Sequence, residues 1–383
     1  MNYAFVPGRT SYERYMSLFF RYKTNTELMP RRRNLRQVDQ FIDRLETNSS
    51  VARPVEEIFI CSHGNDSGYL QIQMADILMN GRSRSTTNTT FEILEEAVRT
   101  GAVNIPSSVL LPRPVVGGSP LPAVVHIKGC KIGQTEPFVR KLKEAFGGQV
   151  AVTAPKHFHL VQVIRRVGAF TYLGYDFAVK RKTPFRNKAE LVTAFQNEHF
   201  QYFDSTPVPD DVWDQRIPRD IRRRKKRFRP TVNLGTPIQR NARRQMSSIR
   251  VIGEFRHKPE RFRFNVTVSG SAPGTSTAAR MAVLRQALQN HPVFQATHEF
   301  PMYERYEYAS LDDFIDGFTW RFAWRRRHNL LRCNAVRHRY TLILPVVEPT
   351  TNNLCLNFFP RPGNPTPEIR LLPESDPRFF LTV

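Results

Sequence analysis

Two short apolar segments, each followed by a chemically reactive residue, constrain the fold of this chain more than any other feature. Residues 58–64 have the sequence IFICSHG, and residues 124–130 have the sequence VVHIKGC. A short run of branched and aromatic residues that ends near a glycine predicts a buried β-strand. The first segment therefore presents His63 where a strand ends, and the second presents Cys130.

The segments around these two runs predict alternating strands and helices. Residues 2–6 and 149–154 are further strand candidates, while residues 91–98 and 136–146 carry apolar side chains at helical spacing. Strands that alternate with helices predict an α/β fold in which helices cover both faces of a mostly parallel sheet. The four residues 76–79 predict an additional short helix.

The pattern changes near residue 205, and it predicts three regions. Residues 1–205 form the α/β domain, whose last elements are an antiparallel hairpin over residues 160–179. Residues 206–230 are rich in proline and aspartate and then in arginine and lysine, which predicts a linker or an exposed arm. Residues 231–383 predict a basic α+β region of unknown fold.

Composition narrows the class of protein. The 383 residues include 57 Lys and Arg against 34 Asp and Glu, and the resulting net charge of +23 predicts a partner rich in negative charge. The 4 cysteines are too few and too scattered for a disulfide framework. No apolar run approaches the roughly 20 residues that span a bilayer, and the N-terminus has no secretory-signal pattern. These features favour a cytoplasmic protein with reduced thiols and no membrane span.

His63 and Cys130 together form the functional hypothesis. Open α/β sheets bind ligands in the crevice outside the carboxyl ends of their strands. A thiol reacts as its thiolate, and a neighbouring histidine can take its proton. A cysteine alone at a strand end is more often a small buried hydrophobe, so the hypothesis depends on the pairing of the two residues.

This pair of motifs resembles the caspase-like cysteine peptidases, the superfamily that includes metacaspases, legumains, separases and gingipains. The resemblance rests on the strand that ends in His63-Gly64 and the strand that ends in Gly129-Cys130. The flanking sequences HGNDSGYL and GCKIG are similar to those of bacterial members. The resemblance covers residues 1–205 and implies a caspase-like three-layer sandwich.

The resemblance also implies a role for each residue of the pair. Cys130 would be the nucleophile that attacks a peptide carbonyl, and His63 would be the general base and acid. The backbone N–H groups of Gly64 and Cys130 would stabilise the oxyanion. No cofactor is implied. The sequence KGCKIG replaces the Gln-Ala-Cys motif of caspases, so their preference for aspartate does not follow.

Other reactive residues near the pair have plainer interpretations. Cys61 shares a strand face with His63 and is expected to pack in the core, and Lys128 and Lys131 are expected to be solvated. A zinc site could draw on Cys61, His63, Cys130, His157 and His159. These residues lack the paired spacing of zinc ligands, so no metal is expected.

Substrate preference depends on charged residues in loops. Asp66 and Asp176 are candidates for recognising a basic residue, although either is as readily a surface charge. The block RRRKKRFR at residues 222–229 would be an obvious site of self-cleavage between the two halves, which favours cleavage after arginine or lysine. The expected partner of the first domain is a protein substrate.

The second half of the chain combines basic and aromatic residues. Its candidate contacts to nucleic acid or to an acidic protein partner are two clusters, Arg222, Arg223 and Arg224 and then Arg325, Arg326 and Arg327. Alternatively, residues 320–331 form an amphipathic helix whose aromatic face is buried and whose arginines are solvated. Residues 311–320 also predict a helix.

The sequence thus favours a cytoplasmic cysteine endopeptidase of the caspase-like type, for which the resemblance implies a regulated role in cell death or defence. One alternative is a nucleic-acid-binding protein whose caspase-like half is a non-catalytic scaffold. A third is a structural adaptor in a larger assembly.

Overall fold

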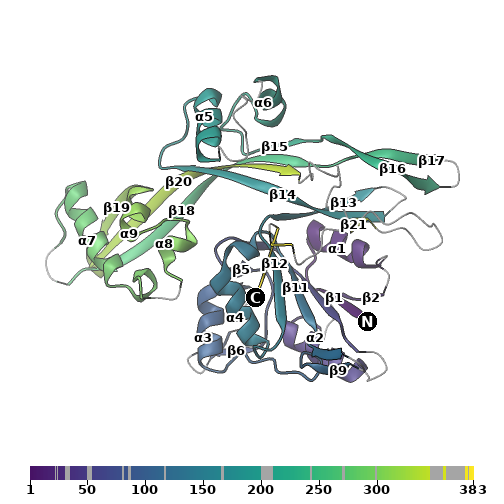
Figure 1. The fold of residues 1–383 in the computed structure, drawn as a ribbon. Helices are drawn as coiled ribbons and strands as arrows, with labels where there is room; N and C mark the ends of the chain where they lie inside the picture. The colour runs from purple at the N-terminus through teal and green to yellow at the C-terminus, as the bar shows by residue number, and fades with distance from the viewer. Residues whose placement is uncertain are drawn as a thin grey trace. The chain divides into compact units, whose positions relative to one another are not determined.

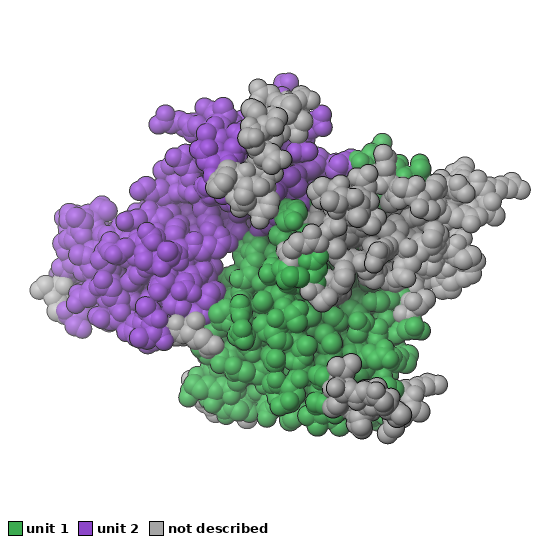
Figure 2. All heavy atoms as spheres, viewed as in Figure 1, with its two compact units in different colours: residues 1–175, 231–251, 345–383 green, residues 176–230, 252–344 purple. Residues whose placement is uncertain are grey.

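The computed structural model describes residues 1–21, 23, 25–30, 35–49, 54–79, 82–84, 88–115, 118–164, 168–199, 210–241, 244–269, 272–297, 300–345, 357–358, 376–377 and 379–383. The chain divides into two compact units (Figure 2). Unit 1 comprises residues 1–175, 231–251 and 345–383, and unit 2 comprises residues 176–230 and 252–344. The chain passes from unit 1 to unit 2 within one strand, β14 (Gly168–Arg181), and residues 231–251 return to unit 1.

Unit 1 is built on a six-stranded sheet with the order β2-β1-β3-β11-β12-β22 (Figure 1). The first five strands are parallel, and β22 is antiparallel to β12. The strands are β1 (Asn2–Val6), β2 (Thr26–Pro30), β3 (Glu57–Cys61), β11 (Val124–Lys128), β12 (Ala151–Pro155) and β22 (Phe380–Thr382). The predicted α/β fold with a mostly parallel sheet is confirmed. Strands β2 and β22 were not predicted.

Helices cover both faces of this sheet. Neighbouring residues of a strand point to opposite faces, so a strand of apolar residues places side chains against helices on both sides. Ala4 and Val6 pack in one buried cluster with Phe20 of α1 (Ser11–Arg21). Phe5 stacks on Phe41 of α2 (Val38–Asn48), with ring centroids 4.9 Å apart. The other helices of the unit are α3 (Phe91–Arg99), the short 3₁₀ helix η1 (Ile132–Gln134) and α4 (Glu136–Ala145).

Smaller β elements complete unit 1. The predicted hairpin is confirmed: β13 (Phe158–Ile164) is antiparallel to β14. The others are β4 (Gly64–Asn65), β5 (Tyr69–Leu70), β6 (Ile77–Met79), β7 (Arg82–Arg84), β8 (Thr89–Thr90), β9 (Arg113–Val115), β10 (Gly118–Leu121), β16 (Thr231–Asn241), β17 (Arg244–Arg250) and β21 (Asn357–Phe358). The helix predicted at residues 76–79 is wrong. Strand β6 pairs with β7 there, because so short an apolar run does not show whether its period is helical or extended.

Unit 2 is a layer of antiparallel strands on which helices pack. Strand β20 (Leu330–Pro345) lies between β18 (Gly253–Thr267) and β19 (Thr319–Arg325), and β15 (Lys225–Phe228) pairs with β18. The other elements of the unit are α5 (Lys188–Glu198), α6 (Asp210–Arg216), α7 (Thr277–Gln289), η3 (Pro292–Phe294), α8 (Met302–Arg305), α9 (Leu311–Asp316) and η4 (Arg326–His328).

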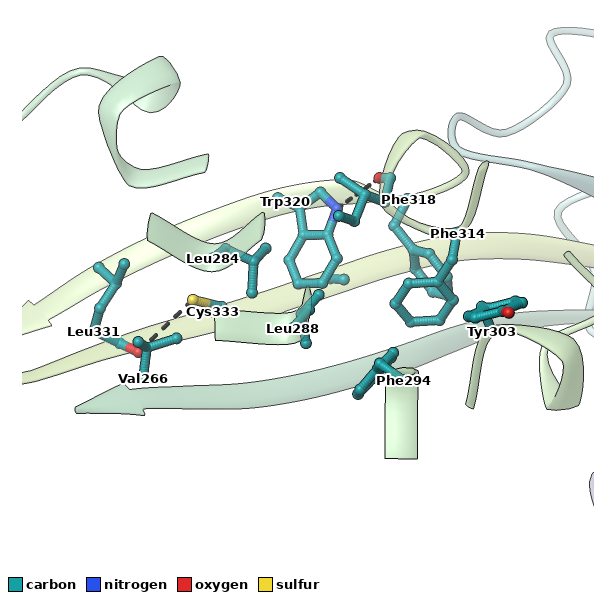
Figure 3. Packing of buried hydrophobic residues seen from close by; sticks show 12 residues of the cluster. Val266, Leu284, Leu288, Phe294, Tyr303, Phe314, Phe318, Trp320, Leu331 and Cys333 are labelled. Carbon is teal, nitrogen blue, oxygen red and sulfur yellow. Dashed lines mark hydrogen bonds between the residues drawn. The ribbon is translucent and has the colours of Figure 1, made fainter. Parts of the chain in front are cut away.

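One aromatic cluster forms the core between these strands and helices (Figure 3). Phe314 of α9 lies against Phe318 with ring centroids 5.0 Å apart, and Leu284 and Leu288 of α7 close the cluster. The indole N–H of Trp320 donates a hydrogen bond of 2.8 Å to the carbonyl of Ile315. The bond satisfies the buried indole and ties the start of β19 to α9.

Two sequence-based expectations for unit 2 are corrected here. The helix predicted at residues 311–320 ends at Asp316, and residues 319–325 form strand β19 rather than part of an amphipathic helix. Gly317 follows the helix, and after it aromatic residues alternate with threonine, arginine and alanine, so that the aromatic residues share one face, which favours a strand. Within the predicted linker or arm of residues 206–230, the structure forms α6 and β15.

Candidate active site

The register of the parallel sheet brings the predicted pair of residues to adjoining strand ends. Cys61 of β3 pairs with Lys128 of β11, and the N–H of Ser62 donates a hydrogen bond of 3.2 Å to the carbonyl of Lys128. His63 and Cys130 each follow these paired residues by two positions. The two residues therefore leave the sheet at the same level, on neighbouring strands about 4.8 Å apart.

Alternation along β3 directs His63 toward helix α1. Phe59 and Cys61 are buried in the cluster that includes residues of α1, as expected for Cys61. His63 continues on the same side. Its Nε2 lies 2.9 Å from the hydroxyl oxygen of Thr10, which immediately precedes α1, and its ring centroid lies 5.1 Å from that of Tyr12.

Cys130 lies in a tight turn between β11 and η1. Lys131 has a left-handed backbone with φ of 62°, which is uncommon for a residue other than glycine. A Cβ atom on Gly133 would lie 2.3 Å from the carbonyl oxygen of Ala154, so only glycine fits where the turn meets β12. Cys130 is partly exposed, and its Sγ donates a hydrogen bond of 3.5 Å to the carbonyl of His159. The sequence GCKIG is therefore the sequence of this turn.

Ile132 packs between the two strand ends. A Cβ atom on Gly64 would lie 2.6 Å from Cγ1 of Ile132, and one on Gly129 would lie 3.2 Å from the same atom. A substitution at Gly64 would force this buried side chain to move. The glycines beside His63 and Cys130 thus allow both strand ends to approach one apolar side chain.

A buried carboxylate that the sequence analysis missed lies behind His63. Glu13 is only 2% exposed, and its Oε2 lies 3.8 Å from Nε2 of His63. The same carboxylate oxygen accepts a hydrogen bond of 3.0 Å from the N–H of Thr10 and a second from the Thr10 hydroxyl. A Cβ atom on Gly8 would lie 2.3 Å from Cδ of Glu13, so glycine at that position leaves room for the carboxyl group.

Thr10 determines which nitrogen of His63 carries the proton. A hydroxyl group has one hydrogen, and that of Thr10 is donated to Glu13. Toward His63 the Thr10 oxygen can only accept, so Nε2 of His63 must be the N–H donor. Nδ1 of the neutral ring is then the nitrogen with a lone pair, and it is the atom available to take a proton.

Tyr12 connects the histidine to the strand that carries the cysteine. Its hydroxyl donates a hydrogen bond of 2.8 Å to the carbonyl of Lys128 and lies 3.0 Å from Nδ1 of His159. Burial raises the pKa of Tyr12 well above its usual value, and negative charge on Cys61, Cys130 or Glu13 raises it further. Tyr12 therefore stays a neutral donor beside the thiol.

The lysines around Cys130 are buried, contrary to the expectation that they are solvated. Lys128 is 5% exposed and Lys131 is 3% exposed. Nζ of Lys128 lies over the ring of Phe59, 5.4 Å from its centroid, and Nζ of Lys131 forms an ion pair with Asp66. Asp66, a candidate for substrate recognition, thus holds the residue that follows Cys130.

The other candidate residues lie in unit 2. Asp176 is buried and forms an ion pair with Arg339, with Oδ2 and Nη2 3.7 Å apart. The first arginine cluster lies in the turn before β15, the second covers the end of β19 and the start of η4, and all six side chains are exposed: Arg222, Arg223, Arg224, Arg325, Arg326 and Arg327.

Comparisons with known proteins identify no relative. No family model matches the chain, and neither a curated protein nor a solved structure matches it. Among the residues that the structure describes, no group of three or more histidine, cysteine, aspartate or glutamate side chains could hold a metal ion. Within the same residues, every helix is too short or too polar to cross a membrane.

Proposed function

We propose that this chain is a cysteine endopeptidase of the caspase-like type, with Cys130 as its nucleophile and His63 as its general base. The observation that supports this most directly is the hydrogen-bond chain from Glu13 through Thr10 to Nε2 of His63. It leaves Nδ1 as the basic nitrogen of a half-exposed histidine beside the strand end that carries the thiol.

The first half of the reaction would form an acyl-enzyme. The Cys130 thiol exchanges its hydrogen bond to the His159 carbonyl for one to Nδ1 of His63, which takes the thiol proton. The thiolate attacks the peptide carbonyl carbon, and a C–S bond forms as the C=O π electrons move to oxygen. The oxyanion then re-forms the carbonyl, the C–N bond breaks, and Nδ1–H of His63 protonates the leaving amine.

The second half would release the acid product. Nδ1 of His63 takes a proton from water, whose oxygen attacks the thioester carbonyl. The C–S bond then breaks, and the proton on Nδ1 returns to Sγ of Cys130. In both halves the Glu13 carboxylate stabilises the transient imidazolium, because it is buried on the side of the ring opposite Nδ1.

The backbone N–H of Gly64 is suited to the oxyanion. The N–H of Gln71 donates to the carbonyl of His63, and Gly64 pairs with Leu70 in the next position of the antiparallel pair. Hydrogen-bonded and non-hydrogen-bonded pairs alternate in such a ladder, so the N–H of Gly64 does not point at β5. The N–H of Lys131 is not a candidate, because it already donates to the carbonyl of His157.

The test is covalent labelling of the intact chain by peptidyl acyloxymethyl ketones with Arg, Lys, Asp or Asn at the cleavage position, read by mass spectrometry. We expect labelling confined to Cys130, favoured by Arg or Lys, abolished in Cys130→Ala and strongly reduced in His63→Ala. Cys61→Ala is the matched control, because Cys61 is a second thiol, at the end of the neighbouring strand β3, that is buried in the core. This variant should label like the wild type.

Three results would overturn the proposal. One is labelling that persists in Cys130→Ala. Another is labelling that His63→Ala leaves unchanged. The third is an absence of labelling with all four probes while simple alkylation shows that Cys130 is accessible.

A further inference from the structure

At the end of the unit 2 sheet formed by residues 259–267, 319–325 and 330–338, helices α7, α8 and α9 pack on one face, and the arginines of the opposite face are exposed or partly exposed. On β18, β19 and β20 the residues that alternate with the buried aromatic core point away from it. The register confirms that these outward residues are neighbours across the strands: Arg263 pairs with Asn334, and Asn334 pairs with Arg321. This face, formed by alternate residues within 259–267, 319–325 and 330–338, is called the outer face below.

The outer face is strongly cationic. Its arginines are Arg261, Arg263, Arg321, Arg325 and Arg332. The three segments contain one carboxylate, Glu260, and its ion pair with the buried Arg337 places it on the helix-covered side. Five guanidinium groups therefore share one face without a carboxylate among its outward residues.

Several carboxylates of unit 2 pair with other arginines. Glu254 pairs with Arg227 and Arg256, and further pairs join Arg285 to Asp312 and Arg339 to both Asp176 and Glu307. Within the described part of the chain, none of the five arginines of the outer face forms an ion pair. The charge of this face is thus left for a ligand to neutralise.

The face is hollowed at its centre. A cavity of about 680 Å³ is lined by the polar residues Arg261, Arg263, Arg321, Asn334 and His338, together with Pro259, Phe262, Thr319, Ala335 and Val336. Nε of Arg263 donates a hydrogen bond of 3.1 Å to the side-chain oxygen of Asn334, which holds one guanidinium at the cavity. Nε of Arg332 is buried and has no hydrogen-bond partner among the described residues.

We propose that the outer face binds single-stranded nucleic acid through its phosphates. Arginine forms two parallel hydrogen bonds to a phosphate, and its planar guanidinium also stacks on bases. Arginines on alternate residues repeat about every 6.6 Å along a strand and face partners about 5 Å away on the next. A flexible single strand can follow such a surface across the sheet.

Single strands fit the face better than the other polyanions. A duplex is a rigid cylinder, which a flat sheet face contacts at few phosphates. An acidic protein would need its carboxylates held at matching positions, whereas every nucleotide supplies a phosphate. The outward residues of the three segments include no phenylalanine, tyrosine or tryptophan, so we expect binding governed by phosphate contacts and weak in sequence preference.

The test is fluorescence anisotropy of labelled 20-nucleotide oligouridine and oligothymidine with the 383-residue Cys130→Ala chain, titrated between 50 and 200 mM salt. If about four phosphates are neutralised, log K should fall with log salt at a slope near −2.8, which is roughly a 50-fold loss of affinity over this range. Equal binding of the two oligonucleotides would place recognition on phosphate, and preference for oligouridine would add the 2′-hydroxyl.

The decisive variant is Arg263→Gln/Arg321→Gln, which should halve the slope to about −1.4 and weaken binding at 50 mM salt several-fold. Arg14→Gln/Arg21→Gln is the matched control: it removes the same charge from exposed positions on α1 of unit 1 and should leave the slope unchanged. Equal melting temperatures of the two variants would establish that both are folded.

The proposal is overturned if the control variant loses as much affinity as the outer-face variant, or if a duplex or polyglutamate competes better than the single strand. Absence of salt-sensitive binding would also overturn it. It does not depend on the proposed peptidase, because the binding test uses a chain without the nucleophile.

Discussion

Replacing Arg337 by alanine should destabilise unit 2 by about 3–5 kcal/mol, because the change leaves the Glu260 carboxylate, whose side chain is only 15% exposed, without its partner. Arg337 is 1% exposed. Its Nε and Nη2 each lie 2.7 Å from Oε2 of Glu260, and its Nη1 donates a hydrogen bond of 2.8 Å to the carbonyl of Tyr306. The rings of Tyr306, Tyr308 and Phe318 surround the guanidinium at 5.0–5.2 Å.

Two further variants separate the contributions. Arg337→Lys keeps the charge but cannot reach both Glu260 and the Tyr306 carbonyl, so it should cost about 1.5–3 kcal/mol, the value of one charge-assisted hydrogen bond. Arg337→Met/Glu260→Leu removes both charges together. It should be more stable than Arg337→Met alone, because no carboxylate is then left unpaired.

Urea unfolding followed by tryptophan fluorescence measures these effects in unit 2 selectively. The chain has 3 tryptophans, Trp213, Trp320 and Trp324, and all of them belong to unit 2. With a slope of about 2 kcal/mol per molar urea, a loss of 4 kcal/mol lowers the midpoint by about 2 M. A loss below about 1 kcal/mol in Arg337→Ala, or a double variant less stable than Arg337→Met, would refute the reasoning.

Three other variants test the structure. Glu13→Gln should slow probe labelling of Cys130 by about 10- to 100-fold without weakening reversible probe binding, because a charge 3.8 Å from His63 is lost; unchanged labelling would contradict this role. Burial raises the pKa of Asp39 to about 6, so the stability of the fold falls as pH rises through 6. In thermal melts, Asp39→Asn should therefore stabilise the fold by about 1–2 kcal/mol at pH 7.5 but not at pH 4. Burial lowers the pKa of His257 and of His338, whose ring nitrogens lie 3.1 Å apart. The stability of unit 2, followed by tryptophan fluorescence, should therefore fall as pH is lowered from 7.5 to 5.5. The fall should be smaller in His338→Gln.

Local patterns in the sequence were sufficient for the sheet of unit 1 and for the pair of residues at its edge. Strands β1, β3, β11 and β12 were found because short apolar runs between helical segments have few other solutions. The rule that parallel strands end at one edge then placed His63 and Cys130 near each other, and the register agrees. For the same reason Cys61, two residues before His63, was correctly assigned to the core.

The surroundings of that pair depend on contacts between distant segments. Thr10 and Glu13 have the spacing of a helix-start capping box, which the sequence does contain, but only the fold places them against His63, 53 residues from Thr10. Lys131 is paired with Asp66, 65 residues away, which no local rule predicts. Lys128 and Lys131 were expected to be solvated because a local sequence does not show which distant group will pair with a buried charge.

The outer face of unit 2 shows the same division. The alternation of arginine with aromatic residues in β18 and β19 is visible in the sequence and fits a strand with one buried face. For residues 320–331, the sequence alone fitted an amphipathic helix equally well. The sequence by itself determined the α/β class, four strands of the parallel sheet and the residues at its edge, because these follow from short-range periodicity. The tertiary structure decided which charges are neutralised, which ring nitrogen of His63 carries the proton and which part of the unit 2 sheet stays exposed. Each of these depends on residues that only the folded chain brings into contact.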